Sequence, residues 1–216
     1  TASIQAFLKA HRLTLNTLLQ AAWALFLSRR AGQSDVLGDV LFGATVSGRH
    51  ADLAGVEAIV GVLSNVLPVR VQMQRERSVI DWLQALQTQQ AEASQYAYVS
   101  PVQIQSWSEC SRRLFNSLLV IENYPMEDEV SDRTLQLKNL RSGIISTYDL
   151  TIIVKPGDVL TLYAEGRDAD RESLQEILND LQSLLSQLIK QPTETVSSIA
   201  LAPSIIHTVD SSASVL

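Results

Sequence analysis

The sequence predicts an α+β domain in which long helices pack on a mixed or antiparallel sheet. Three long segments carry apolar residues at helical spacing, and several shorter apolar runs have the patterns of strands. No strict alternation of strand and helix is visible, which argues against a purely parallel sheet. An apolar fraction of 46% and a charged fraction of 19% in 216 residues are ordinary for a globular protein with a substantial core.

Three long helices are expected. The first covers residues 14–30, with Thr14 as its N-cap. The second covers residues 78–94, and Ser78 and Asp81 have the spacing of a capping box. The third follows Asp170 and ends near Lys190, just before Pro192. Their apolar stripes are formed by Leu15, Leu18, Leu19, Ala22, Leu25 and Phe26, then Val79, Trp82, Leu83 and Leu86, then Leu174, Ile177, Leu178, Leu181, Leu185 and Leu188.

Strand patterns lie between these helices. Residues 67–73 alternate apolar and polar side chains, as in a strand with one wet face, and Pro68 suits a strand start or a sheet edge. Residues 40–46 and 114–121 are more continuously apolar, which is typical of strands covered on both faces.

A hairpin is expected near the third helix. Residues 150–154 and 159–163 have strand patterns, and the intervening residues 155–158 have the sequence KPGD, a strong turn signal. The two segments should therefore pair as antiparallel neighbours.

The domain is predicted to span residues 1–192. From residue 193 the chain loses periodicity and becomes rich in Ser and Thr, so residues 193–216 are predicted to be a linker or a disordered tail. Residues 35–38 (DVLG) are followed by residues 39–43 (DVLFG), which look like a short duplication.

Charge and hydropathy exclude several classes of protein. The net charge is −6 and blocks of Lys and Arg are absent, so a general nucleic-acid binder is not expected. No apolar run reaches about 18 residues, so no membrane span is expected. Cys110 is the only cysteine, which excludes an internal disulfide, and residues 1–10 lack a signal-peptide pattern. A cytoplasmic, reducing location is the expectation.

Residues with obvious catalytic or metal-binding chemistry are scarce. His11, His50 and His207 lie far apart in the sequence and form no HExxH pattern, so no metal site is predicted. No GxSxG, GxxxxGK[ST] or GxGxxG pattern occurs. Cys110 has no nearby histidine, and the acidic residues 127–129 have the composition of a solvated loop. Composition and spacing alone thus identify no catalytic residue.

Four segments, in order, resemble motifs of the condensation domains of nonribosomal peptide synthetases. Residues 15–25 (LNTLLQAAWAL) resemble the helix that opens the second lobe, and residues 42–49 (FGATVSGR) resemble the strand and turn that follow. Residues 60–70 (VGVLSNVLPVR) are similar to the motif VGxFxNTLPxR, and residues 114–125 (LFNSLLVIENYP) to LFxSLxxFENYP. The resemblance covers residues 14–190, most of the chain.

This resemblance implies one lobe, the C-terminal one, of a chloramphenicol-acetyltransferase-like fold, in which two similar lobes form a V around a tunnel. Such domains join an upstream acyl or peptidyl thioester to a downstream aminoacyl amine. Both substrates are covalently carried on the phosphopantetheine of peptidyl carrier proteins, so no cofactor is expected to bind this chain directly. The family's catalytic histidine belongs to an HHxxxDG motif of the N-terminal lobe. This chain has no adjacent histidines, so no catalytic residue is predicted and the lobe should be inactive alone.

By the same resemblance, five residues are candidates for lining the substrate tunnel. Ser47, Arg49 and Asn65 match polar positions of the family motifs, while Gly48 and Gly61 would let the backbone approach a substrate arm closely. Gly43 belongs with these glycines.

Simpler roles stay open for the same residues. Ser47 with the following glycine forms a potential turn, Arg49 has Asp52 and Glu57 as potential ion-pair partners, and Asn65 is able to satisfy backbone groups of its own loop.

The chain departs from the family pattern in places. Val66 replaces the usual Thr, Leu63 and Ser64 replace an aromatic–apolar pair, and the segment at residues 111–114 is shortened. Two other functions are therefore weighed against a working lobe. One is a noncatalytic module that binds carrier proteins or neighbouring synthetase domains. The other is an independent acyltransferase that uses coenzyme A, with His11 or His50 as its base.

Overall fold

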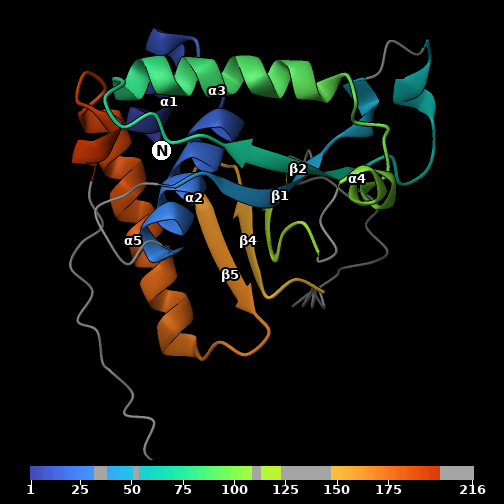
Figure 1. Cartoon of the computed structure of the whole chain (residues 1–216). Helices are drawn as coiled ribbons and strands as arrows, with labels where there is room; N and C mark the ends of the chain where they lie inside the picture. The colour runs from blue at the N-terminus through green and yellow to red at the C-terminus, as the bar shows by residue number, and fades with distance from the viewer. Residues whose placement is uncertain (32–37, 51–53, 109–112, 123–146, 200–216) are drawn as a thin grey trace, which may run out of the picture.

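The computed structural model describes residues 1–31, 38–50, 54–108, 113–122 and 147–199 (Figure 1). Within them, helices lie against a five-stranded sheet, as the predicted α+β class requires. In chain order the elements are α1 (Ala2–His11), α2 (Leu15–Ala31), β1 (Val40–Val46), η1 (Gly48–His50), η2 (Val56–Ala58), β2 (Asn65–Val71), α3 (Val79–Ser94), α4 (Pro101–Trp107), β3 (Ser117–Ile121), β4 (Leu150–Lys155), β5 (Thr161–Gly166), α5 (Arg171–Lys190) and η3 (Val196–Ser198).

The sheet is mixed, with the strand order β2-β1-β3-β4-β5. The pairs β1–β2 and β4–β5 are antiparallel, whereas β1–β3 and β3–β4 are parallel. The antiparallel β4–β5 pair confirms the hairpin predicted around residues 155–158. Since β2 is an edge strand, Pro68 occupies the kind of position expected from its missing N–H.

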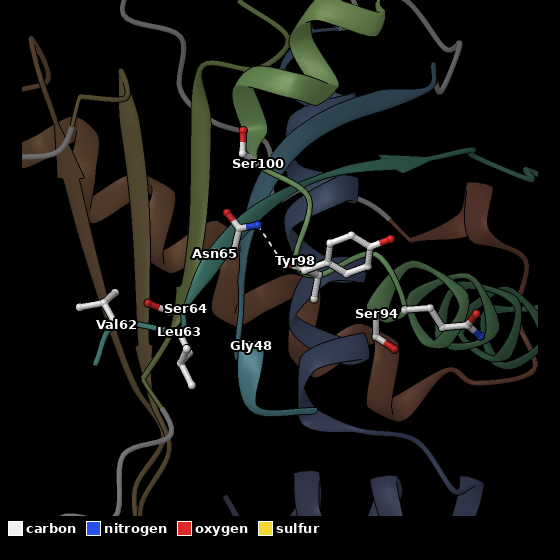
Figure 2. A pocket seen from close by; sticks show the side chains of 10 residues that line it. Gly48, Val62, Leu63, Ser64, Asn65, Ser94, Tyr98 and Ser100 are labelled. Carbon is white, nitrogen blue, oxygen red and sulfur yellow. Dashed lines mark hydrogen bonds between the residues drawn. The ribbon is translucent and has the colours of Figure 1, made fainter. Parts of the chain in front are cut away.

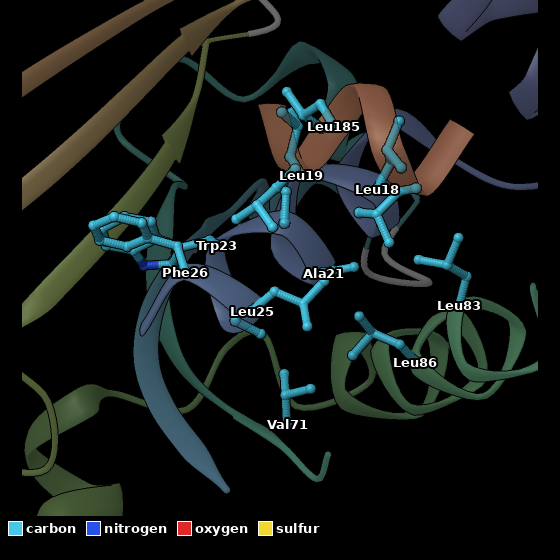
Figure 3. Close-up of a cluster of buried hydrophobic side chains, with 14 of the residues drawn as sticks. Leu18, Leu19, Ala21, Trp23, Leu25, Phe26, Val71, Leu83, Leu86 and Leu185 are labelled. Carbon is cyan, nitrogen blue, oxygen red and sulfur yellow. The ribbon is translucent and has the colours of Figure 1, made fainter. Parts of the chain in front are cut away.

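Helix α2 is the centre of the core. The side chains that it buries almost completely between the sheet, α3 and α5 are Leu18, Leu19, Ala21, Ala22, Trp23, Ala24, Leu25 and Phe26 (Figure 3). Trp23 is fully buried and stacks on Phe26 with ring centroids 5.1 Å apart. A helix that is apolar nearly all round has to be covered on every side, and the position of α2 meets that demand.

Two buried polar residues of α2 are satisfied by α3. The hydroxyl of Thr17 shares its proton between the side-chain oxygens of Gln87 and Gln90, which lie 3.1 and 2.9 Å away. The amide of Gln90 in turn donates to the side-chain oxygen of Gln20, at 2.8 Å. Because buried polar groups are costly when unpaired, this network fixes the register of α3 on α2.

The three long helices begin and end close to the predicted residues. At α3, the Ser78 hydroxyl oxygen accepts the Asp81 backbone N–H, at 3.2 Å, and donates to the Asp81 carboxylate, at 2.7 Å. At α5, the Asp170 carboxylate accepts the Ser173 N–H, at 2.8 Å. This bond lowers the pKa of Asp170, because it stabilises the ionised carboxylate.

Other elements depart from the sequence-based expectations. Strand β2 covers residues 65–71 instead of 67–73, and β3 begins at residue 117 instead of 114. Strand β1 has the predicted bounds, but Leu41 is 37% exposed, so this strand is not covered evenly on both faces. Helices α1 and α4 were not predicted, although Ser100 and Gln103 form a complete capping box at α4.

The residues after α5 remain attached to the domain. Val196 and Ile199 are fully buried, and the guanidinium of Arg29 donates to the backbone carbonyls of Ser197 and Ile199. Residues 193–199, placed by prediction in the linker, are therefore packed. The domain boundary at residue 192 stays a prediction, and residues 200–216 lie outside the described residues, as do residues 32–37 of the duplicated segment.

Candidate functional site

A pocket of about 890 Å³ lies where the loop before β2 meets the turn between α3 and α4 (Figure 2). Its walls come from the start of η1, the end of the loop before β2, the start of β2, the end of α3 and the turn that follows. The residues that line it are Gly48, Val62, Leu63, Ser64, Asn65, Ser94, Gln95, Ala97, Tyr98 and Ser100.

Asn65 joins the two sides of this pocket. Its side-chain amide donates to the backbone carbonyls of Ala97 and Val99, at 2.8 and 2.7 Å. Its side-chain oxygen accepts the backbone N–H of Val66, at 2.8 Å. Both amide hydrogens are therefore engaged, and the residue holds the turn after α3 against the first residue of β2.

Gly48 sets how closely η1 approaches the loop before β2. Its backbone N–H donates to the carbonyl of Leu63, at 3.1 Å. A Cβ added at Gly48 would collide with that carbonyl oxygen. The close approach expected of this glycine is real, but its partner in the structure is the backbone of Leu63.

The neighbours of Gly48 shape the turn and the next loop. The hydroxyl of Ser47 accepts the backbone N–H of Arg49, at 3.4 Å, which is the contact of a serine turn. The Nη1 of Arg49 donates to the carbonyls of Val56 and Ile59, both at 3.1 Å. Arg49 therefore supports the loop that leads towards the pocket, while its pairing with Asp52 or Glu57 stays a prediction.

Two of the five predicted site residues, Gly48 and Asn65, line this pocket. Ser47, Arg49 and Gly61 do not line it. Gly61 has a φ of 151° and open space around its α carbon, so it shapes the exposed loop. The role of all five in a substrate tunnel stays a prediction.

Sequence reasoning missed the other wall of the pocket. Ser94, Tyr98 and Ser100 come from the end of α3 and the turn after it. The capping box of Ser100 and Gln103 was a usable signal, because it marks a turn between two helices where polar side chains gather. Gly43, grouped with the tunnel glycines, faces the ring of Phe115, which would collide with a Cβ at that position.

Of the three histidines, only His11 has a described side chain, and it lies away from the pocket lining. His11 lies in α1, and its ring packs on Phe7 with centroids 4.7 Å apart. His50 ends η1. His207, Cys110 and the acidic residues 127–129 lie outside the described residues. Among the residues that are described, no group of His, Cys, Asp or Glu is arranged to hold a metal ion.

Exposed apolar side chains lie on the loop before β2 and on the segment that follows α3, and two of them, Val62 and Tyr98, line the pocket. Val60 and Val62 are 99% and 90% exposed, on the loop before β2. Tyr98, Val102 and Trp107 are also largely exposed, on the turn before α4 and on α4 itself. Apolar side chains gathered on one region of a surface mark an interaction site, whereas isolated ones do not.

None of the helices in the described parts of the chain has the length and apolar character needed to cross a membrane.

The curated relatives are peptide synthetases. The chain is 41% identical over 208 residues to a linear gramicidin synthase protein of Brevibacillus parabrevis, covering 93% of this chain and 3% of that protein. It is 34% identical over 199 residues to surfactin synthase subunit 3 of Bacillus subtilis (strain 168), covering 89% of this chain and 15% of that protein. The chain therefore spans a small part of the length of these relatives.

Solved structures show the same fold. The first condensation domain of the CDA synthetase matches with a TM-score of 0.73 at 18% identity, over 93% of this chain and 45% of that one. The X-domain from teicoplanin biosynthesis matches with a TM-score of 0.72 at 19% identity, over 93% of this chain and 47% of that one. These matches support the predicted chloramphenicol-acetyltransferase-like fold.

The family profile described as "Condensation domain" matches residues 1–205, nearly the whole chain. This match agrees with the synthetase relatives and with the fold. The chain belongs to the condensation domain family of nonribosomal peptide synthetases.

Proposed function

We propose that this chain is the C-terminal lobe of a condensation domain and forms one wall of the tunnel in which an amide bond is made. The lobe works with an N-terminal lobe that carries the HHxxxDG motif, in the same polypeptide or in another. The reaction joins an acyl or peptidyl thioester to an aminoacyl thioester, each held on the phosphopantetheine of a peptidyl carrier protein.

The main support for this proposal is the fraction of a solved condensation domain that the chain matches. The chain matches the solved CDA condensation domain over 93% of its own length but only 45% of that domain's length. The chain therefore corresponds to about one half of a two-lobed domain. In our proposal the other half, of similar size, is the N-terminal lobe. The order of the sequence motifs supports the C-terminal half as the part that this chain forms.

The pocket supports a role in holding a substrate arm. Amine attack on a thioester needs two long arms in near-attack geometry, in a site from which water is excluded. The pocket offers neutral hydrogen-bonding groups and a wall fixed by Asn65, with exposed apolar residues around it for a covering partner. The proton transfer belongs to the histidine of the N-terminal lobe in this scheme, since none of the described lining residues is a histidine.

The test is reconstitution. The chain is combined with an N-terminal lobe bearing HHxxxDG, and two carrier proteins loaded with an acyl group and an amino acid are added. We expect amide product only when both lobes are present, and loss of product when both histidines of the motif are replaced by alanine. Product formation by this chain alone would contradict the proposal.

The alternative is a noncatalytic module that binds carrier proteins or neighbouring synthetase domains. The exposed Tyr98, Val102 and Trp107 favour it, because aromatic and apolar residues are enriched in the buried centres of protein interfaces. Binding of a loaded carrier protein by this chain alone, without product when the N-terminal lobe is added, would support this alternative.

The coenzyme A acyltransferase has less support, because His11 packs on Phe7 and lies outside the pocket lining.

A further inference from the structure

We propose that the wall formed by this pocket selects uncharged aminoacyl groups over charged ones. This inference rests on the proposed function and adds to it the class of substrate. The inference concerns the side chain of the amino acid that is carried into the tunnel. Membership of the family does not say which side chains are preferred.

Among the residues that the structure describes, the lining contains no charged residue. Its ten members are glycine, alanine, valine and leucine, together with three serines, one asparagine, one glutamine and one tyrosine. The nearest arginine in sequence, Arg49, directs its Nη1 to the carbonyls of Val56 and Ile59 and is not part of the lining. A charged group placed in the pocket therefore finds no opposite charge among these described lining residues.

Neutral partners are present instead. The hydroxyls of Ser64 and Tyr98 make no hydrogen bond to other described residues, so they remain able to bond to a ligand. Asn65 is different, because both of its amide hydrogens are already donated to Ala97 and Val99. Hydroxyl groups of this kind are able to bond to an uncharged amide, and the lining residues Val62, Leu63 and Ala97 offer apolar contact.

Closure of the pocket by a second lobe would increase the difference in rate between charged and uncharged substrates. The pocket of this lobe is open, so a charged group in it keeps much of its hydration. When a partner lobe covers it, an unpaired charge loses water without gaining an ion pair, which slows the reaction of a charged substrate. Uncharged side chains do not incur this cost, so the difference in rate should favour them.

The experiment compares matched pairs of substrates in the two-lobed enzyme. Carrier proteins are loaded with glutamine or glutamate and with norleucine or lysine, since the members of each pair are similar in shape but differ in charge. The rates of product formation are measured at saturating donor. We expect each neutral member to react at least about tenfold faster, as an unpaired buried charge predicts.

Variants of Ser64 then test whether this wall causes the preference for uncharged substrates. Ser64→Asp should raise the rate with lysine relative to norleucine and lower the rate with glutamate relative to glutamine. Ser64→Lys should have the opposite effects. Ser64 is exposed in this lobe, so both variants should keep a melting temperature close to that of the unaltered chain. The matched control is Ser106→Asp on α4, which lies outside the lining and should leave both ratios unchanged.

Two kinds of failure are distinguishable. Equal rates within each pair, or ratios that do not respond to either Ser64 variant, overturn the selection of uncharged groups while product formation upholds the proposed function. Absence of product with all four amino acids, in an assembled two-lobed enzyme, overturns the proposed function and this inference with it.

Discussion

The side-chain amide of Asn65 donates a 2.7 Å hydrogen bond to the backbone carbonyl of Val99, across 34 residues of sequence. A second bond from the same amide reaches the carbonyl of Ala97, at 2.8 Å. The edge strand β2 and the turn after α3 are joined through this one side chain. The shape of the pocket therefore depends on Asn65, even though its donors are already engaged and do not serve a ligand.

Replacing Asn65 by aspartate should open this junction. The variant keeps an oxygen for the Val66 N–H but loses both donors and places a negative charge beside two carbonyl oxygens. We expect a loss of about 1–3 kcal/mol in the free energy of unfolding, measured by urea denaturation at pH 7. The control is Asn179→Asp on α5, where the side-chain oxygen only accepts from Gln175 and the stability should hardly change. Equal losses in both variants would contradict a special role for Asn65.

Replacing Gly48 by alanine should displace the loop before β2. The added methyl group would meet the carbonyl oxygen of Leu63, and backbone cannot move aside as a flexible side chain can. Overpacking of this kind costs about 1–3 kcal/mol. Gly38→Ala is the matched control, because no atom lies within 4 Å of a Cβ built at Gly38. Thermal denaturation of the two variants checks the prediction, and a Gly48 variant as stable as the Gly38 variant would refute it.

The segment after α5 offers a third test. Arg29 donates to the carbonyls of Ser197 and Ile199, and Val196 and Ile199 are fully buried. Arg29→Met should release this segment, so the amide hydrogens of residues 196–199 should exchange at least about tenfold faster, which is about 1.4 kcal/mol of local stability. Arg77→Met serves as the control, since the Arg77 side chain is exposed and bonds to Gln74. Unchanged exchange in the Arg29 variant would show that burial and the backbone hydrogen bonds to residues 75–79 hold the segment without this side chain.

The long helices were predictable because their signals are local. In α5, the N-cap at Asp170, the apolar stripe and the following Pro192 all lie within or beside the segment itself, and the observed bounds agree with the prediction. Strand β1 and the β4–β5 hairpin were predictable for the same reason. The order β2-β1-β3-β4-β5, with two parallel pairs, depends on contacts between distant segments, and no local pattern gives it.

The site was predictable only in part. Gly48 and Asn65 were found through family motifs, and both line the pocket. The opposite wall, with Tyr98 and Ser100, belongs to a turn whose position is set by the hydrogen bonds of Asn65. Arg49 was predicted to line the site because it follows a motif glycine. In the structure its guanidinium donates to carbonyls of the neighbouring loop, and it does not line the pocket. The direction of a side chain depends on the folded backbone, which spacing does not reveal.

The N-cap of α5 predicts a dependence of stability on pH. The hydrogen bond from the Ser173 backbone N–H holds the pKa of Asp170 below its ordinary value of 3.8. The ionised form is thus favoured in the folded state, and its contribution is present above the unfolded pKa and lost as the pH falls through the folded one. Asp170→Asn keeps the cap without the titration. The melting temperature of the unaltered chain should fall relative to this variant between about pH 5 and pH 2. A constant difference across that range would count against the assignment.

The exposed loop before β2 predicts how the partner lobe binds. Val60 and Val62 are 99% and 90% exposed, so a double replacement by serine should change the stability of this chain by less than about 0.5 kcal/mol. If the proposed N-terminal lobe covers the loop, the same change should weaken assembly by about tenfold or more, since burial of one valine side chain contributes about 1.5 kcal/mol. Val159→Ser, at a position 73% exposed in the β4–β5 turn, is the matched control. Titration of each variant with the N-terminal lobe in a calorimeter measures the difference. Unaltered affinity in the double variant would place the lobe interface elsewhere on the surface.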